Sequence, residues 1–209
     1  RASIPVNWEE LMQPILQLIS SENIPISRIY NWDETALFYR QMPKSTLAKK
    51  GDDGAGLKED KNRVSLMMMM NGDGSYRKVV IIGKTKSPRN ITPEFWKEFN
   101  IEYFSNKKGW MTREIFTKLL LNFDSQLNEK AILILDNFSG HKFNESVVLK
   151  NVIPCYLPPN TTSKTQPLDA GIICNFKIKY RNYMVSYSLG KMLEKNFRPN
   201  EINFKLVVP

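Results

Sequence analysis

Cysteine and histidine are scarce in this 209-residue chain, which has two of the first and one of the second. Cys155 and Cys174 form no CxxC pair and are too few for a disulfide framework. Both lie in apolar stretches, so we expect buried thiols in a reducing compartment. The sequence also lacks a signal peptide and an apolar run of membrane-spanning length. Because the chain begins with Arg1, we expect a soluble fragment of a longer protein with no membrane partner.

Acidic residues are outnumbered: 30 lysines and arginines against 21 aspartates and glutamates give a net charge of +9. A basic domain is consistent with a polyanionic partner such as DNA, although charge that serves only solubility would look the same. The distribution is more informative, because four cations lie close in sequence to Asp169, and they are Lys164, Lys177, Lys179 and Arg181. The length suffices for one well-buried α/β domain.

An unbroken apolar run, Ala131 to Leu135, is typical of a strand buried on both faces, with helices above and below the sheet. The run stops at Asp136, and turn-forming residues follow. Ligands bind at this edge of open α/β sheets. The alternative for a single aspartate in this position is a cap on the next helix.

A second predicted strand, within residues 27–35, runs into Asp33. If the two strands are neighbours, their carboxylates repel unless a cation lies between them. Hard oxygen ligands favour Mg²⁺ or Mn²⁺. A third acid, Asp169, follows a short strand over 152–157 and a loop over 158–165, and it begins a run that looks helical through Tyr187.

Other polar residues near these acids have weaker claims. Glu145 follows the predicted central strand too soon to be the third ligand, and Glu194 lies far along the terminal region. We expect His141 to cap a turn or support an acid, although binding to a scissile phosphate is an alternative. Asn137 and Gln166 are candidates for supporting the acids or contacting DNA.

The remaining pattern predicts a helix over residues 4–20, kinked or broken at Pro14, and a helix over 112–123 capped by Thr112. A hairpin is expected from strands 64–70 and 78–82 around Asn71–Gly74, with alternate methionines of Met67–Met70 buried. Residues 44–62 are expected to form a mobile loop, and 94–99 a short helix. Lys84, Lys86 and Arg89 would form a small basic loop.

Three blocks carry a family resemblance: NWDETALFYRQMP at 31–43, LILDNFSGH at 133–141 and YLPPNTTSKTQPLDAGII at 156–173. Together they resemble the pogo/Tigger branch of the DDE transposases, in the mariner superfamily, which includes centromere protein B and other host-captured relatives. The resemblance spans Ile26 to Met184. It implies an α/β, RNase H-like fold with a mixed central sheet and helices on both faces. The predicted order of strands and helices agrees with that fold.

The resemblance also implies a function. Residues 26–190 would be the catalytic domain of a cut-and-paste DNA transposase in the nucleus, and Asp33, Asp136 and Asp169 would hold two Mg²⁺ or Mn²⁺ ions. Residues 1–25 would lead from missing DNA-binding modules, and 191–209 would be a tail. The full-length protein would form a homodimer or higher oligomer. From their charge beside Asp169, Lys177, Lys179 and Arg181 are candidates for contacting DNA, and ordinary solvated positions on the last helix are the alternative.

Two alternatives stay open. A host-captured relative could bind DNA or chromatin, or dimerise, without cutting. The second alternative is a general RNase H-like nuclease that acts on RNA.

Overall fold

The computed structural model describes residues 3–41, 62–88, 91–144 and 146–192. Several predictions concern residues outside these ranges. They are the loop over 44–62 (except Asn62), Arg89, Glu145, Glu194 and all but two residues of the tail over 191–209.

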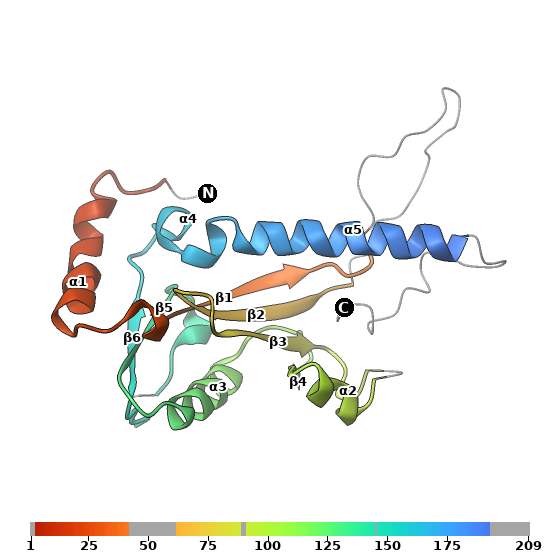
Figure 1. Ribbon diagram of the computed structural model, residues 1–209, viewed down its shortest axis with the longest axis horizontal. Helices are drawn as coiled ribbons and strands as arrows, with labels where there is room; N and C mark the ends of the chain where they lie inside the picture. The colour runs from red at the N-terminus through yellow and green to blue at the C-terminus, as the bar shows by residue number, and fades with distance from the viewer. Residues whose placement is uncertain (1–2, 42–61, 89–90, 145, 193–209) are drawn as a thin grey trace.

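A six-stranded mixed sheet in the order β4-β3-β2-β1-β5-β6 forms the centre of the molecule (Figure 1). β1 pairs with β2, and β2 with β3, in antiparallel fashion; the β1–β5, β5–β6 and β3–β4 pairs are parallel. The predicted mixed sheet, with its antiparallel hairpin, is therefore confirmed. The strands are β1 (Ile29–Leu37), β2 (Val64–Asn71), β3 (Arg77–Gly83), β4 (Glu102–Ser105), β5 (Ala131–Leu135) and β6 (Val152–Tyr156).

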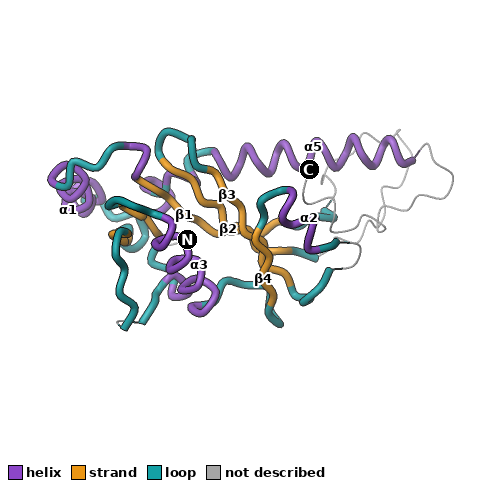
Figure 2. The backbone as a smooth tube through the Cα atoms, turned by 60° about the horizontal axis from the view of Figure 1, so that its bottom comes forward, coloured by secondary structure: helices purple, strands orange, loops and turns teal. Residues whose placement is uncertain are grey.

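Helices cover both faces of this sheet. In Figure 1, α5 runs along one face and α3 lies on the opposite one, while Figure 2 shows α2 and β4 at the end remote from α1. The α-helices are α1 (Trp8–Ser21), α2 (Pro93–Glu98), α3 (Arg113–Gln126), α4 (Thr162–Thr165) and α5 (Ile172–Met192). Three short 3-10 helices join them, η1 (Ile26–Arg28), η2 (Ser139–His141) and η3 (Pro167–Asp169).

The methionines of β2 show how completely the sheet is covered. Met67 and Met69 pack in the core under α3, whereas Met68 and Met70 pack in the core under α5. The prediction that only alternate methionines are buried was wrong, because Met67, Met68 and Met69 are all buried and Met70 is half-buried. A strand with helices on both faces buries its side chains in both directions.

Two predicted boundaries differ from the structure. α1 continues through Pro14 without a break, and this proline lies on the exposed side of the helix. Water can therefore satisfy the Glu10 carbonyl that loses its N–H donor. The loop predicted over 158–165 contains one α-helical turn, α4. Cys174 is also exposed rather than buried, because its side of α5 faces solvent.

Two further elements depart from the predicted order. The predicted order of elements has a helix between β5 and β6, and among the described residues of that segment the only helix is the three-residue η2. The short strand β4 was not predicted; it adds four residues to the β3 edge, with Ile81 opposite Tyr103. The helix over 112–123 is confirmed as α3, whose N-terminal N–H of Ile115 is capped by the Thr112 hydroxyl.

Candidate functional site

Asp33 and Asp136 lie level with each other at the end of the sheet where β5 finishes, which is its carboxyl edge. β1 and β5 are parallel, with Asn31 opposite Ile134, and continuing that register by two residues brings Asp33 opposite Asp136. Asp136 follows the last residue of β5, as predicted. Asp33, however, does not end its strand, because pairing with β2 carries β1 on to Leu37.

The position of β5 also differs from the expectation. β1 and β2 occupy the middle of the sheet, while β5 has only β6 between it and the sheet edge. Asp33 therefore lies on a central strand that runs past the end of its shorter parallel neighbour. The acid site lies where the shorter strand β5 ends beside the longer strand β1.

Asp169 ends the 3-10 turn η3, and hydrogen bonds fasten this turn to β1. The backbone N–H of Leu168 donates to Asn31 Oδ1 at 3.0 Å, and Asn31 Nδ2 donates to Gln166 Oε1 at 2.9 Å. Gln166 Nε2 donates in turn to the Trp32 carbonyl at 3.2 Å. Because Asn31 and Gln166 are both buried, their amides hold the turn that carries Asp169 beside the strand that carries Asp33.

Asn31 was not singled out from the sequence, although a signal was present. It is a polar residue between Tyr30 and Trp32, inside a predicted buried strand. A buried amide must find partners, and here they are the Ile134 carbonyl on β5 and a segment more than 130 residues away. The role of Gln166 follows from the same network, since its buried side chain positions the turn.

The three carboxylates act on one another electrostatically. Burial, followed by the charge of Asp169 and then that of Asp136, raises the pKa of Asp33 to about 7. The N–H of Glu34, which donates to Asp33 Oδ1 at 2.8 Å, acts in the opposite direction. Burial also raises the pKa of Asp169, with Lys177 opposing and Asp136 reinforcing the effect. A divalent cation is the partner that would relieve this repulsion.

The buried side chain of His141 supports Asp136 by a direct contact. Its Nδ1 lies 2.5 Å from Asp136 Oδ1, and its ring is 1% exposed, packed between Phe116 and Phe138. Burial alone would raise the pKa of Asp136, but His141, the Phe138 N–H and Lys142 together outweigh it and lower that pKa. A buried ring offers no surface to a phosphate, so this geometry favours the supporting role over phosphate binding.

Asn137 joins the loops that follow β5 and β6. Its Nδ2 donates to the Leu157 carbonyl, and its Oδ1 accepts from Lys142 Nζ at 2.9 Å. The Lys142 ammonium lies 3.3 Å from the centroid of the Tyr156 ring. Asn137 therefore stiffens the edge next to Asp136.

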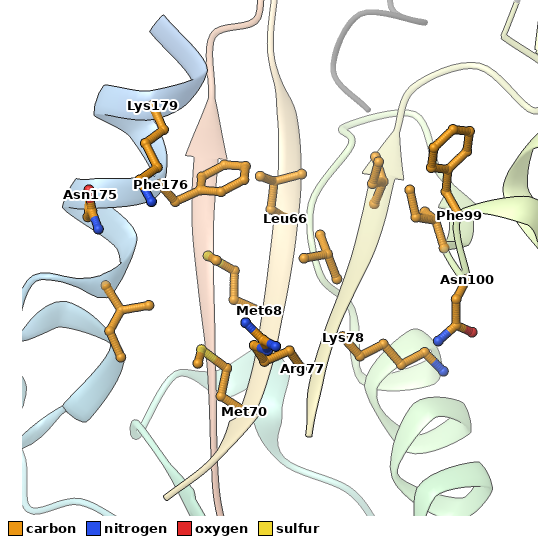
Figure 3. A pocket seen from close by; sticks show the side chains of 14 residues that line it. Leu66, Met68, Met70, Arg77, Lys78, Phe99, Asn100, Asn175, Phe176 and Lys179 are labelled. Carbon is orange, nitrogen blue, oxygen red and sulfur yellow. The ribbon is translucent and has the colours of Figure 1, made fainter. Parts of the chain in front are cut away.

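Of the four cations close in sequence to Asp169, three belong to α5, and these three do not share one face of the helix. Lys177 lies near the acids: burial lowers its pKa, whereas Asp169 and Asp33 raise it. Arg181, one turn further on, acts on Lys177 as well. Lys179 instead lines a groove of about 600 Å³ between α5 and the strands β2 and β3, next to Phe176 and above Met68 (Figure 3). Residues two apart on a helix point about 200° from each other.

The acids do not form a finished metal cage. Within the described ranges, no three histidine, cysteine, aspartate or glutamate side chains lie close enough together to hold a metal ion. The donor set nevertheless fits a hard divalent cation, because it consists of carboxylates whose mutual repulsion a cation would relieve. A shared ion would require Asp33, Asp136 and Asp169 to move closer together.

A comparison with models of known protein families identifies the family of this chain. The model of the DDE superfamily endonucleases matches residues 61–206, which is more than half of the sequence. The chain therefore belongs to the DDE superfamily endonucleases. The match includes Asp136 and Asp169, whereas Asp33 precedes it.

The curated relatives include Tigger transposable element-derived proteins, Jerky proteins and CENP-B homolog proteins. Tigger transposable element-derived protein 7 from Homo sapiens is 32% identical over 90% of this chain and 37% of its own length. CENP-B homolog protein 2 from Schizosaccharomyces pombe is 32% identical over 90% of this chain and 38% of its own length. The human Jerky protein homolog is 29% identical over 79% of this chain and 31% of its own length. The chain thus spans about a third of the length of these relatives.

The fold matches a solved transposase. The Mos1 transposase, in its paired-end complex with the left transposon end, aligns with a TM-score of 0.53 over 94% of this chain and 57% of its own. The two sequences are 12% identical, so the comparison concerns the fold alone. It identifies the mixed sheet as the predicted RNase H-like fold. None of the helices in the described ranges has the length and apolar character needed to cross a membrane.

Proposed function

We propose that this chain is the catalytic domain of a DNA transposase that cuts and joins DNA strands at transposon ends with Mg²⁺ or Mn²⁺. The observation that carries the proposal is the placement of Asp33 level with Asp136, together with the fastening of the Asp169 turn to the same strand. Residues 26–190 would form this domain, and residues 1–25 would lead into it from DNA-binding modules elsewhere in a longer nuclear protein that assembles as an oligomer.

The chain's own residues have distinct tasks in this proposal. Asp33, Asp136 and Asp169 would hold the ions, which when bound activate the attacking oxygen and stabilise the leaving one. His141 and Asn137 keep Asp136 and its loop in place. Asn31 and Gln166 fix the turn that ends in Asp169. Lys177 offers a positive charge to a phosphodiester beside the acids.

The test is nicking of supercoiled plasmid DNA by the full chain in Mg²⁺ or Mn²⁺, with EDTA as the control. We expect nicking with either metal and none in EDTA. Asp169→Asn should abolish it, while Asp73→Asn, in an exposed turn, should not. Nicking by Asp169→Asn at the wild-type rate would contradict the assignment of this residue.

A second function is favoured by one observation, the lack of a finished metal cage among the described residues. A host-captured relative could use the same fold to bind DNA without cutting it. Calorimetric titration of the full chain with Mn²⁺ separates the two. Binding that is lost in Asp33→Asn supports the nuclease, whereas no binding together with intact DNA affinity supports the non-cutting protein.

The positions of the α5 cations lead to a prediction about DNA binding. Neutralised phosphates release counterions, so the logarithm of affinity falls linearly with the logarithm of salt concentration, by roughly 0.9 per phosphate contacted. The Lys177→Ala/Arg181→Ala double variant should reduce this slope by about 1 to 2. Lys179→Ala should leave it unchanged, because that residue lines the groove on another side of α5.

The measurement is fluorescence anisotropy of two unrelated duplexes across a salt series. Equal weakening on both duplexes is expected, since phosphate contacts carry no sequence information. A slope that changes only in Lys179→Ala would place the DNA over the groove instead.

A further inference from the structure

Trp110 presents a large exposed ring at the surface. Its side chain is 49% exposed, and the Arg63 guanidinium lies 4.1 Å from the centroid of the ring. Exposed tryptophan is common at binding surfaces because the ring offers wide apolar contact with little loss of conformational entropy. Neither residue belongs to the acid site described above.

The turn that carries Trp110 is held rigidly. Asn106 Oδ1 accepts the N–H groups of Lys108 and Gly109 at 3.1 and 2.8 Å, and Asn106 Nδ2 donates to the Trp110 carbonyl at 2.7 Å. Ser65 Oγ fastens the same turn to β2 by donating to the Gly109 carbonyl at 2.9 Å. Gly109 has φ +64°, which favours glycine at this position. The backbone that carries the ring is therefore fixed before any ligand arrives.

This turn lies at the same edge of the sheet as the acids. β2 begins there and β3 and β4 end there, since Gly83 pairs with Ser105. Ser65 lies opposite Ala36, three residues beyond Asp33 on β1. The anchor of the turn is thus roughly 10 Å from Asp33 along the strand axis and one strand across. Ser65 points to the α3 face of the sheet and Asp33 to the α5 face, so a strand that reaches both must pass over this end of the sheet. At roughly 3.4 Å per nucleotide, the spacing along a duplex strand, about three nucleotides cover such a distance.

The segments at this end of the sheet are rich in positive charge. The described stretches 62–67, 83–88 and 105–113 contain no acidic residue. Arg113 connects this region to the acid site, because its Nε donates to the Ser139 carbonyl at 3.3 Å in the loop after Asp136. The cations in these stretches are Arg63, Lys84, Lys86, Lys107, Lys108 and Arg113.

We propose that Trp110, together with Arg63, binds an unpaired nucleotide of a DNA strand by stacking on its base, a few nucleotides from the strand held at the acids. The inference rests on the proposed function, because it names a feature of the substrate of that site. An exposed aromatic ring among cations is the arrangement that binds single strands: the ring takes the base, and the cations take the phosphates. Duplex DNA offers no base face to such a ring.

The experiment measures the affinity of the full chain for a 12-nucleotide oligothymidine and for a blunt duplex of equal length, in EDTA so that no cleavage occurs. Trp110→Ala should weaken binding of the single strand by about 5- to 150-fold, with less than twofold change for the duplex. Trp110→Phe should retain most of the affinity, because it keeps a ring. Phe99→Ala, an exposed ring beside the groove of Figure 3, is the matched control and should change neither affinity.

The outcomes distinguish this inference from the proposed function. Unchanged oligothymidine affinity in Trp110→Ala overturns the stacking site even if the wild-type chain nicks plasmid DNA. Loss of that affinity supports the stacking site even if no nicking is found. If Trp110→Ala fails to fold by circular dichroism, comparing Trp110→Phe with Trp110→Leu decides the matter, and equal affinities of these two overturn the inference.

Discussion

Asp136→Asn is expected to abolish metal-dependent strand cleavage while leaving the fold intact. The amide keeps the size of the side chain but removes one negative charge at the centre of the proposed ion site. Metal ions stabilise the transition state of such reactions by several kcal/mol. If the misplaced ion loses about 4 kcal/mol of this stabilisation, cleavage slows about 10³-fold. The measurement is the rate of plasmid nicking in Mg²⁺, with circular dichroism to check the fold.

The control must separate charge from hydrogen bonding, because Asp136 also contacts His141. His141→Gln removes the imidazole but keeps all three carboxylates, so we expect a smaller loss, on the order of tenfold to a hundredfold. Mn²⁺ titration supplies an independent readout. Nicking by Asp136→Asn at a near wild-type rate would show that this carboxylate holds no ion, whatever the behaviour of the histidine variant.

The sequence predicted the elements whose pattern is local. The apolar run of β5, the hairpin of β2 and β3, and the Thr112-capped helix α3 are all confirmed. The edge strand β4 was missed because four residues are too few to display an alternating pattern. The helical turn α4 is equally short, and its polar residues before a proline are typical of a loop.

The position of Asp33 shows what local pattern cannot supply. The sequence indicated a strand that ends in an acid, but the strand continues to Leu37 because β2 pairs with it along its whole length. Where a strand ends is decided by its partner, and the partner here comes from beyond residue 60. The edge at which Asp33 lies was still predictable, since it is set by the shorter strand β5 and its terminal Asp136.

The residues that hold the site together were harder to predict than the acids themselves. The bonds from Asn31 to Leu168 and Gln166 join segments more than 130 residues apart. The role of His141 was partly predictable because it lies five residues after Asp136, close enough to bond across one turn. Distant hydrogen bonds between amides leave no spacing pattern in a single sequence.

Asp124 is a further residue with a long-range role, and it leads to the largest expected effect on stability. Its side chain is 4% exposed. It accepts N–H groups from Lys150 and, on its other oxygen, from Asn151 and Val152, at 2.8 to 2.9 Å. An aspartate in the last turn of a helix opposes the helix dipole, so its presence at the end of α3 was a sign in the sequence of another partner.

Asp124→Ala should lower the free energy of unfolding by about 3 kcal/mol, because it leaves three N–H groups at the start of β6 without their acceptor, and the one of Val152 is buried. For a domain of this size the midpoint of thermal unfolding should fall by about 6–12 °C. Ser125→Ala, the exposed neighbour on the same helix, is the matched control and should change it by less than about 2 °C. Differential scanning calorimetry at pH 7 measures both.

The pH dependence tests the cause of this loss. Burial alone would raise the pKa of Asp124, but the three backbone N–H groups outweigh it and hold that pKa below its ordinary value of 3.8. A carboxylate whose pKa is lower in the folded state stabilises the fold above its unfolded pKa, and this stabilisation is lost as the pH falls through the folded pKa. The gap in midpoint between the wild type and Asp124→Ala should therefore stay constant from pH 7 to about 5 and narrow below about 4. A gap that does not change with pH would mean that packing, rather than the charged acceptor, fastens α3 to β6.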